Sequence, residues 1–115
     1  MTNSEITSER IRKIIESKKI DFYEKKMFGG WCVMVDEKML IATIKGGILA
    51  RVDPEEVEEL LIRDGADQMM QKGRIMKGYL MLTDDAYDLD SDLEFWIDKC
   101  LEFNPKAKSS KKKKG

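Results

Sequence analysis

Three short apolar segments, separated by turn residues, occupy residues 28–52. They read GGWCVMV, MLIATI and ILARV, and the two gaps between them are Asp36-Glu37-Lys38 and Lys45-Gly46-Gly47. Runs of this length that are rich in β-branched and apolar residues indicate strands, and gaps of this size fit hairpin turns. A glycine at position 46 or 47 would supply the positive φ that a tight turn requires. The segment therefore predicts three antiparallel strands.

Helical spacing of apolar residues marks two segments near the ends of the chain, residues 4–19 and the segment that runs from residue 91 to the proline at 105. Thr2 with Glu5, and Ser91 with Glu94, fit the spacing of a capping box, and Pro105 should close the later helix. Both segments predict helices that cover a core. The apolar positions expected to face that core are Ile6, Ile11, Ile14 and Ile15 in the first helix and Leu93, Trp96, Ile97, Cys100 and Leu101 in the last.

A middle helix and a second pair of strands complete the expected order of elements. Asp53 can cap a helix over residues 53–65, Pro54 suits its first position, and Gly65 should end it. A short strand near residues 68–71 and a better one at residues 79–82 are joined by a Gly73-Arg74 connection. The order α-β-β-β-α-β-β-α predicts an α+β fold of two layers, with one antiparallel sheet and the helices on a face of it.

The last ten residues differ from the rest of the chain in charge. They hold six lysines and no acid, whereas residues 1–105 hold 15 basic and 22 acidic residues. A lysine-rich segment without a run of apolar residues cannot bury a core, so we predict one domain over residues 1–104 and a disordered tail over residues 105–115. The acidic body should repel nucleic-acid phosphates, which leaves the tail or a local basic patch for that kind of binding.

The chain contains no histidine. This excludes the commonest general base and the Ser-His and Cys-His nucleophilic pairs. The aspartates of residues 84–92 do not fit a calcium-binding loop, and a solvated turn with a helix cap is the better interpretation. Cys32 and Cys100 lack CxxC spacing and lie in apolar segments, so we expect reduced, buried thiols. We expect no catalytic residue, no metal and no cofactor.

The pattern of apolar residues also bears on location. The longest uninterrupted apolar runs, residues 32–35 and 39–42, fall far short of the roughly 20 residues needed to cross a bilayer. Charged residues are threaded through the first 19 positions, unlike the uninterrupted apolar stretch of a secretory signal. We therefore expect a cytoplasmic protein with no membrane segment.

Two local motifs are candidate interaction sites. Phe28-Gly29-Gly30 opens the first strand of the meander, where close approach of a ligand is weighed against a simple bulge or tight bend. Gly73-Arg74 and Lys77-Gly78-Tyr79 place two cations and a ring at the mouth of a strand, and Arg51 interrupts the third apolar segment. These cations could bind an anion, an acidic partner or phosphate. The alternative is that the arginines pair with carboxylates, such as those of residues 53 and 56, and fix the loop.

The same motifs resemble the TfoX N-terminal domain family. The resemblance runs through KKMFGGWCVMVDEKMLIATIKGGILARVD, GRIMKGYLML and the final helix with Trp96, over about residues 8–103. It implies a two-layer α+β domain of the secretion-chaperone type. Full-length members regulate natural competence together with a transcription activator and carry a second, C-terminal domain. The family supplies no catalytic residues, so the matching positions are candidates for an interaction surface or a structural constraint: Phe28, Gly29, Gly30, Arg51, Gly73, Arg74, Lys77, Gly78 and Tyr79.

These observations together favour a non-enzymatic regulatory module that binds a protein partner. A homodimer through an edge strand is one form that such binding could take. The alternative function is weak nucleic-acid binding by the lysine tail together with Arg51, Arg74 and Lys77.

Overall fold

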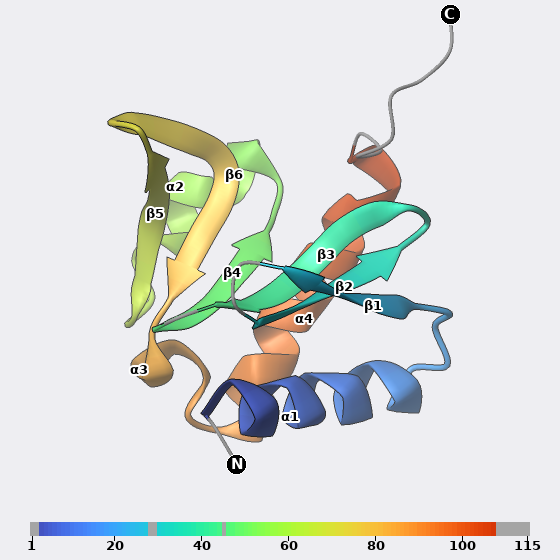
Figure 1. The fold of residues 1–115 in the computed structure, drawn as a ribbon. Helices are drawn as coiled ribbons and strands as arrows, with labels where there is room; N and C mark the ends of the chain where they lie inside the picture. Colours follow the sequence, from blue (N-terminus) through green and yellow to red (C-terminus); the bar gives the residue numbers. More distant parts are fainter. Residues whose placement is uncertain (1–2, 28–29, 45, 108–115) are drawn as a thin grey trace, which may run out of the picture.

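One six-stranded antiparallel sheet forms the centre of the protein, in the strand order β1-β2-β3-β4-β6-β5 (Figure 1). The computed structural model describes residues 3–27, 30–44 and 46–107. The predicted α+β class is confirmed, and the order of elements agrees roughly with the prediction. The elements are α1 (Asn3–Ser17), β1 (Tyr23–Met27), β2 (Gly30–Val35), β3 (Lys38–Ile44), β4 (Gly47–Arg51), η1 (Pro54–Glu56), α2 (Val57–Leu60), β5 (Ala66–Gln71), β6 (Arg74–Leu82), α3 (Asp84–Tyr87), α4 (Asp90–Phe103) and η2 (Asn104–Lys106).

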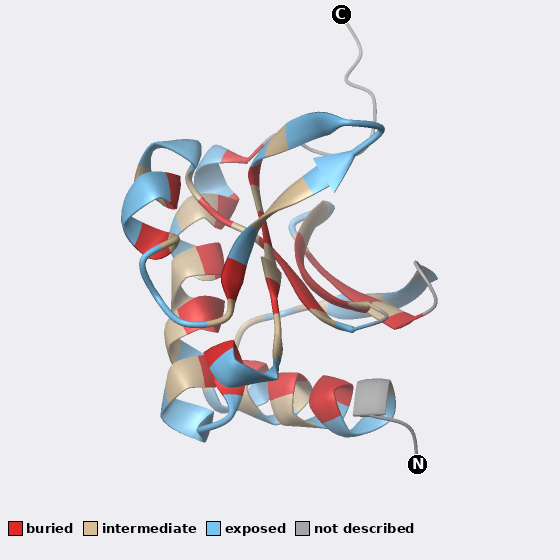
Figure 2. Cartoon of the chain, turned by 90° about the vertical axis from the view of Figure 1, so that its left-hand side faces the viewer, coloured by how far each residue is buried: buried red, intermediate tan, exposed pale blue. Residues whose placement is uncertain are grey.

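The main core lies between one face of the sheet and helices α1 and α4. Figure 2 shows the buried segments of these helices turned toward the strands. Trp96 is fully buried at the centre of α4, and its indole Nε1 donates a hydrogen bond to the carbonyl oxygen of Ala86 at 3.2 Å. The bond satisfies the one polar atom of this ring, so Trp96 contributes its full apolar surface to the core. The helical positions buried here are Ile11, Ile15, Leu93, Trp96, Ile97 and Cys100.

The sheet face opposite the helices carries a second, smaller core. Its buried members, Cys32, Met34, Ala42 and Leu49, come from β2, β3 and β4. Partly buried side chains of β5 and β6, including Met69 and Tyr79, pack against them. Strands from both halves of the sheet therefore contribute to this cluster.

The predicted meander is confirmed as β2, β3 and β4. Asp36 and Glu37 form the first turn with φ values of 56° and 63°, and Gly46 has a φ of 91° in the second. These left-handed conformations match the right-handed twist of the flanking strands. Gly30 is needed for packing at the start of β2, because a Cβ there would collide with the Thr43 carbonyl oxygen.

Several sequence-based boundaries were wrong. β1 was not expected, because YEKKM has no apolar alternation. Helix α4 begins at Asp90 with Leu89 at its N-cap and no capping side chain, so the predicted capping box at Ser91 does not form. The helix expected over residues 53–65 is one 3-10 turn followed by the single turn α2, although Asp53 does cap it, accepting a hydrogen bond from the Glu55 backbone N–H at 2.9 Å.

Other expectations concern the ends of the chain. Ile6 was predicted to face the core, yet it is 46% exposed. The capping residue proposed at Thr2 lies outside the described residues. Of the predicted tail, Pro105 and Lys106 belong to η2 and the buried Ala107 is its C-cap, and the remainder lies outside the described residues. Within the described part of the chain, no helix is both long and apolar enough to span a bilayer.

Candidate interaction surface

Arg51 ends β4 with its guanidinium stacked against two aromatic rings. The guanidinium carbon lies 5.5 Å from the centroid of the Tyr79 ring and 6.0 Å from that of Phe103. Arg51 makes no ion pair with any described residue, so the predicted pairing with Asp53 or Glu56 is wrong. Those two carboxylates instead meet Lys106 at 3.8 Å and Lys99 at 2.9 Å.

The Arg51 side chain is half-buried, but its polar atoms reach solvent. No described side-chain nitrogen or oxygen is both buried and without a hydrogen-bond partner. Because Arg51 has no such partner among the described residues, its guanidinium nitrogens must be accessible to water. A planar cation held by stacking, with its donors unused, can accept a carboxylate in the bidentate geometry that guanidinium groups favour.

Strand pairing and one glycine set the position of this arginine. Arg51 lies directly opposite Tyr79 in the antiparallel β4–β6 pair. Next to this pair, Gly78 adopts a φ of 82° and its carbonyl oxygen accepts a hydrogen bond from the Val52 backbone N–H at 2.7 Å. The left-handed residue bends β6 away from β4, and from that point toward its tip β6 pairs with β5 alone. The glycine thus places Tyr79 at the end of the shared ladder.

The remaining predicted cations lie on the β5–β6 hairpin. Lys77, Gly73 and Arg74 are exposed there, as Figure 2 shows for the whole hairpin tip. Arg74 is five residues of strand from Tyr79, a separation of about 16 Å. Arg51 and Arg74 therefore do not form one basic patch. We define the Arg51 corner as Arg51, Tyr79 and Phe103.

Of the FGG motif only Gly30 is described, and it does not join this corner. Gly30 is buried at the opposite part of the sheet, between β1 and β3, where its close approach to Thr43 accounts for the lack of a side chain. Phe28 and Gly29 lie outside the described residues. Phe103, which completes the corner, was not predicted as a site residue. It is remote from Arg51 in sequence, and no local pattern linked the two.

The two cysteines are free and buried, as predicted. Burial raises the pKa of the Cys32 thiol to about 11 and that of the Cys100 thiol to about 12. Both side chains are consequently protonated at neutral pH and are poor nucleophiles.

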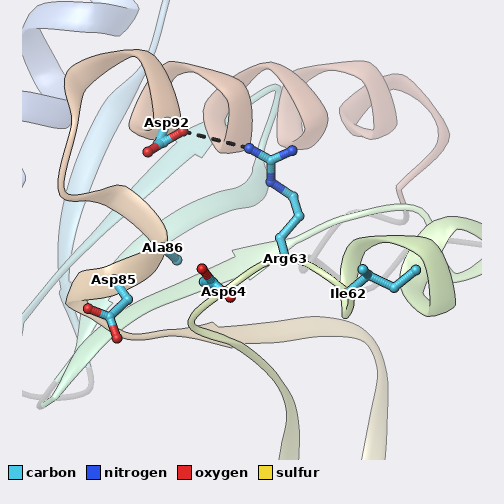
Figure 3. A pocket seen from close by; sticks show the side chains of 6 residues that line it. All are labelled: Ile62, Arg63, Asp64, Asp85, Ala86 and Asp92. Atoms are coloured by element: carbon cyan, nitrogen blue, oxygen red, sulfur yellow. Dashed lines mark ion pairs between the residues drawn. The ribbon is translucent and has the colours of Figure 1, made fainter.

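A pocket between the segment that precedes β5, α3 and the start of α4 has one arginine and three carboxylates in its lining (Figure 3). It is lined by Ile62, Arg63, Asp64, Asp85, Ala86 and Asp92. The Arg63 guanidinium lies 3.8 Å from the centroid of the Phe95 ring and 3.7 Å from an Asp92 carboxylate oxygen. Asp64 and Asp85 form no ion pair with any described residue. Across the described residues, no three metal-ligating side chains are grouped as an ion would require.

Comparison with known families bears on these positions. The sequence model described as TfoX N-terminal domain matches residues 20–104. The chain belongs to the TfoX N-terminal domain family. The match begins just before β1 and ends at η2, so it includes all six strands, α4 and the whole Arg51 corner. A search among curated proteins finds no match.

Proposed function

We propose that this TfoX N-terminal domain is a non-enzymatic regulatory module that binds a protein partner in the control of transcription. Membership of the family supports a regulatory role. Control of competence genes, acting through a transcription activator, is the specific process that the family favours. Two buried, unpaired thiols are typical of a reducing compartment, which supports action in the cytoplasm.

The observation that carries this proposal is the Arg51 guanidinium. It lies over two rings and has no carboxylate partner among the described residues, in a chain whose residues 1–105 carry more acidic than basic residues. An arginine oriented by aromatic rings is the kind of side chain that dominates protein interfaces. A carboxylate on the partner would complete its hydrogen bonding.

The residues argue for recognition rather than turnover. The chain offers no histidine, and burial keeps both thiols protonated. The most accessible functional groups of the Arg51 corner are a cation and rings, which bind ligands but do not transfer protons at neutral pH. We therefore expect that binding changes the affinity or the position of the partner and leaves its covalent structure unchanged.

The experiment is quantitative capture of partners from cells on the immobilised chain. Arg51→Met removes the charge and keeps an unbranched side chain of similar reach. Lys13→Met removes from α1 an exposed cation that forms no ion pair with a described residue, and it is the matched control. We expect capture of the specific partner to fall about tenfold with Arg51→Met and to be unchanged with Lys13→Met. Arg51→Lys should give an intermediate loss because it keeps the charge without the planar stack.

Two outcomes would contradict the proposal. One is equal capture by Arg51→Met and the unchanged chain, with both variants folded by circular dichroism. The other is tight binding of a short DNA duplex whose affinity falls steeply with salt and drops when the chain is cut after Ala107. That result would assign the function to the lysine tail and nucleic-acid phosphates.

A further inference from the structure

The outer edge of β5 is open. β5 pairs with β6 on one side and is the last strand of the sheet, and Figure 1 shows no strand beyond it. The opposite edge, β1, carries the exposed Lys25 and Lys26, and edge lysines discourage pairing with another chain. β5 reads ADQMMQ and has neither lysine nor proline. Its edge therefore lacks the lysines that protect β1, although the pairing of β5 with β6 is irregular between Gln68 and Met70.

Charge is divided between the two ends of this strand. Asp64 and Asp67 lie at its start, and Lys72 and Arg74 lie in the turn at its far end. All four are exposed, and none forms an ion pair with a described residue. An edge that is acidic at one end and basic at the other is complementary to a reversed copy of itself.

Exposed apolar side chains accompany both ends. Ile62, just before the strand, is 82% exposed. Met70 and Ile75 face each other across the hairpin and are 52% and 53% exposed. Large apolar side chains this exposed, beside an open strand edge, are typical of an association surface. A purely anionic or purely cationic partner would complement the charge at only one of the two ends of β5.

We propose that β5 pairs antiparallel with β5 of a second copy, about a two-fold axis at Gln68. A two-fold axis perpendicular to the sheet requires a residue opposite itself, because paired residues share a face. Centring on Gln68 puts an uncharged amide on the axis and sets Ala66 opposite Met70 of the second copy. The same register brings Lys72 and Asp64 of the second copy, which flank the two strands outside β5, to the same end of the pair, twice by symmetry. The two sheets become one continuous sheet.

This inference is independent of the partner proposed for the Arg51 corner. Arg51 lies on β4, and β6 separates β4 from β5. The second copy would therefore leave the corner uncovered. A monomeric chain would overturn the dimer without touching the proposed function, and loss of partner capture would leave the dimer intact.

Sedimentation equilibrium of the full chain over a dilution series tests the proposal. The expected result is a reversible dimer. Lys72→Glu should weaken it about tenfold, because two opposite-charge contacts become like-charge contacts, and Asp64→Lys should do the same. The double variant, Asp64→Lys with Lys72→Glu, restores both contacts and should dimerise like the unchanged chain.

Lys19→Glu is the matched control. Lys19 is exposed, has no ion pair among the described residues, and shares with Lys72 a left-handed backbone, with φ values of 58° and 53°. We expect it to leave the dimer unchanged, and Gln68→Lys to give a monomer by placing like charges on the axis. A monomer at every concentration would overturn the proposal. So would a double variant that stays as weak as the single ones.

Discussion

Arg51 looks like an interruption of an apolar strand in the sequence, and the structure gives it a different role. It follows the buried residues of β4, and its guanidinium lies over the rings of Tyr79 and Phe103. Stacking of a guanidinium on a ring contributes about 0.5–1 kcal/mol at an accessible site. The interaction orients the cation without neutralising it, which is what a recognition site requires.

The buried thiols give a prediction about pH. In the unfolded chain, thiols ionise near their ordinary pKa of 9.0, whereas burial raises the pKa to about 11 for Cys32 and about 12 for Cys100. Above pH 9.0 the unfolded state therefore binds fewer protons than the folded state, and the free energy of unfolding falls as the pH rises. We expect urea unfolding to show constant stability up to about pH 8.5 and a clear decline by about pH 10.

A variant with both cysteines replaced by alanine isolates this effect. It should be less stable at neutral pH, because two core side chains are shortened, but should lose the decline below about pH 10. The pKa of Tyr87 is raised by burial from 10.0 to about 12, and that of Lys18 is raised from 10.5 by hydrogen bonds to Glu94 and Asp98. These two pKa shifts lower the free energy of unfolding only at higher pH than the thiols do. An unchanged slope in the variant would refute the assignment to the thiols.

At the scale of elements, the β5–β6 hairpin depends on two left-handed glycines in different surroundings. Gly78 has a φ of 82°, and a Cβ there would lie 2.9 Å from the Val52 carbonyl oxygen. Gly73 has a φ of 79°, and a Cβ there would meet no atom within 4 Å. We expect Gly73→Ala to cost about 1 kcal/mol and Gly78→Ala about 3 kcal/mol of unfolding free energy.

Urea denaturation of the two alanine variants measures this difference directly. Gly73→Ala carries the backbone cost alone and so serves as the control for Gly78→Ala. The additional loss expected for Gly78→Ala comes from crowding where β6 leaves β4. The difference between the two variants therefore measures strand packing, and Gly73→Ala alone measures the backbone strain of a turn. Equal losses in the two variants would show that the bend at Gly78 relaxes freely.

How much of this architecture the sequence predicts depends on burial. β2, β3 and β4 are buried on both faces, so their apolar runs are visible in the sequence. β1 lies at an edge with exposed lysines, and its sequence carries no such signal. The helix start at Asp53 was predicted from local chemistry, but its length was not, because the chain turns into β5 after one helical turn.

The candidate site was predictable to the same limited degree. Arg51 and Tyr79 were singled out by their setting between glycines and apolar residues, and they lie opposite each other in the sheet. Phe103 was missed because it meets Arg51 only through packing of α4 on the sheet. The expectation that carboxylates would neutralise Arg51 failed, because Asp53 pairs with Lys106 and Glu56 pairs with Lys99.

Across the molecule, some charged side chains form ion pairs within the fold and others do not. Ion pairs tie the helices together, as Lys18 of α1 contacts Glu94 and Asp98 of α4 at 2.8 and 3.0 Å. Exposed pairs of this kind contribute less than about 1 kcal/mol each, so the stability of the fold rests on the two apolar cores. The cations at the Arg51 corner and the hairpin tip form no ion pair with a described residue. They are available to another macromolecule.

Site-specific photocrosslinking in cells tests the central claim, recognition of a protein at the Arg51 corner, most directly. A benzophenone side chain replaces Tyr79 in one variant and the exposed Ile6 of α1 in a control. We predict a discrete protein adduct from position 79, none of that mass from position 6, and its loss when Arg51→Met is added. Equal labelling at the two positions, or an adduct at position 79 that persists with Arg51→Met, would contradict the account.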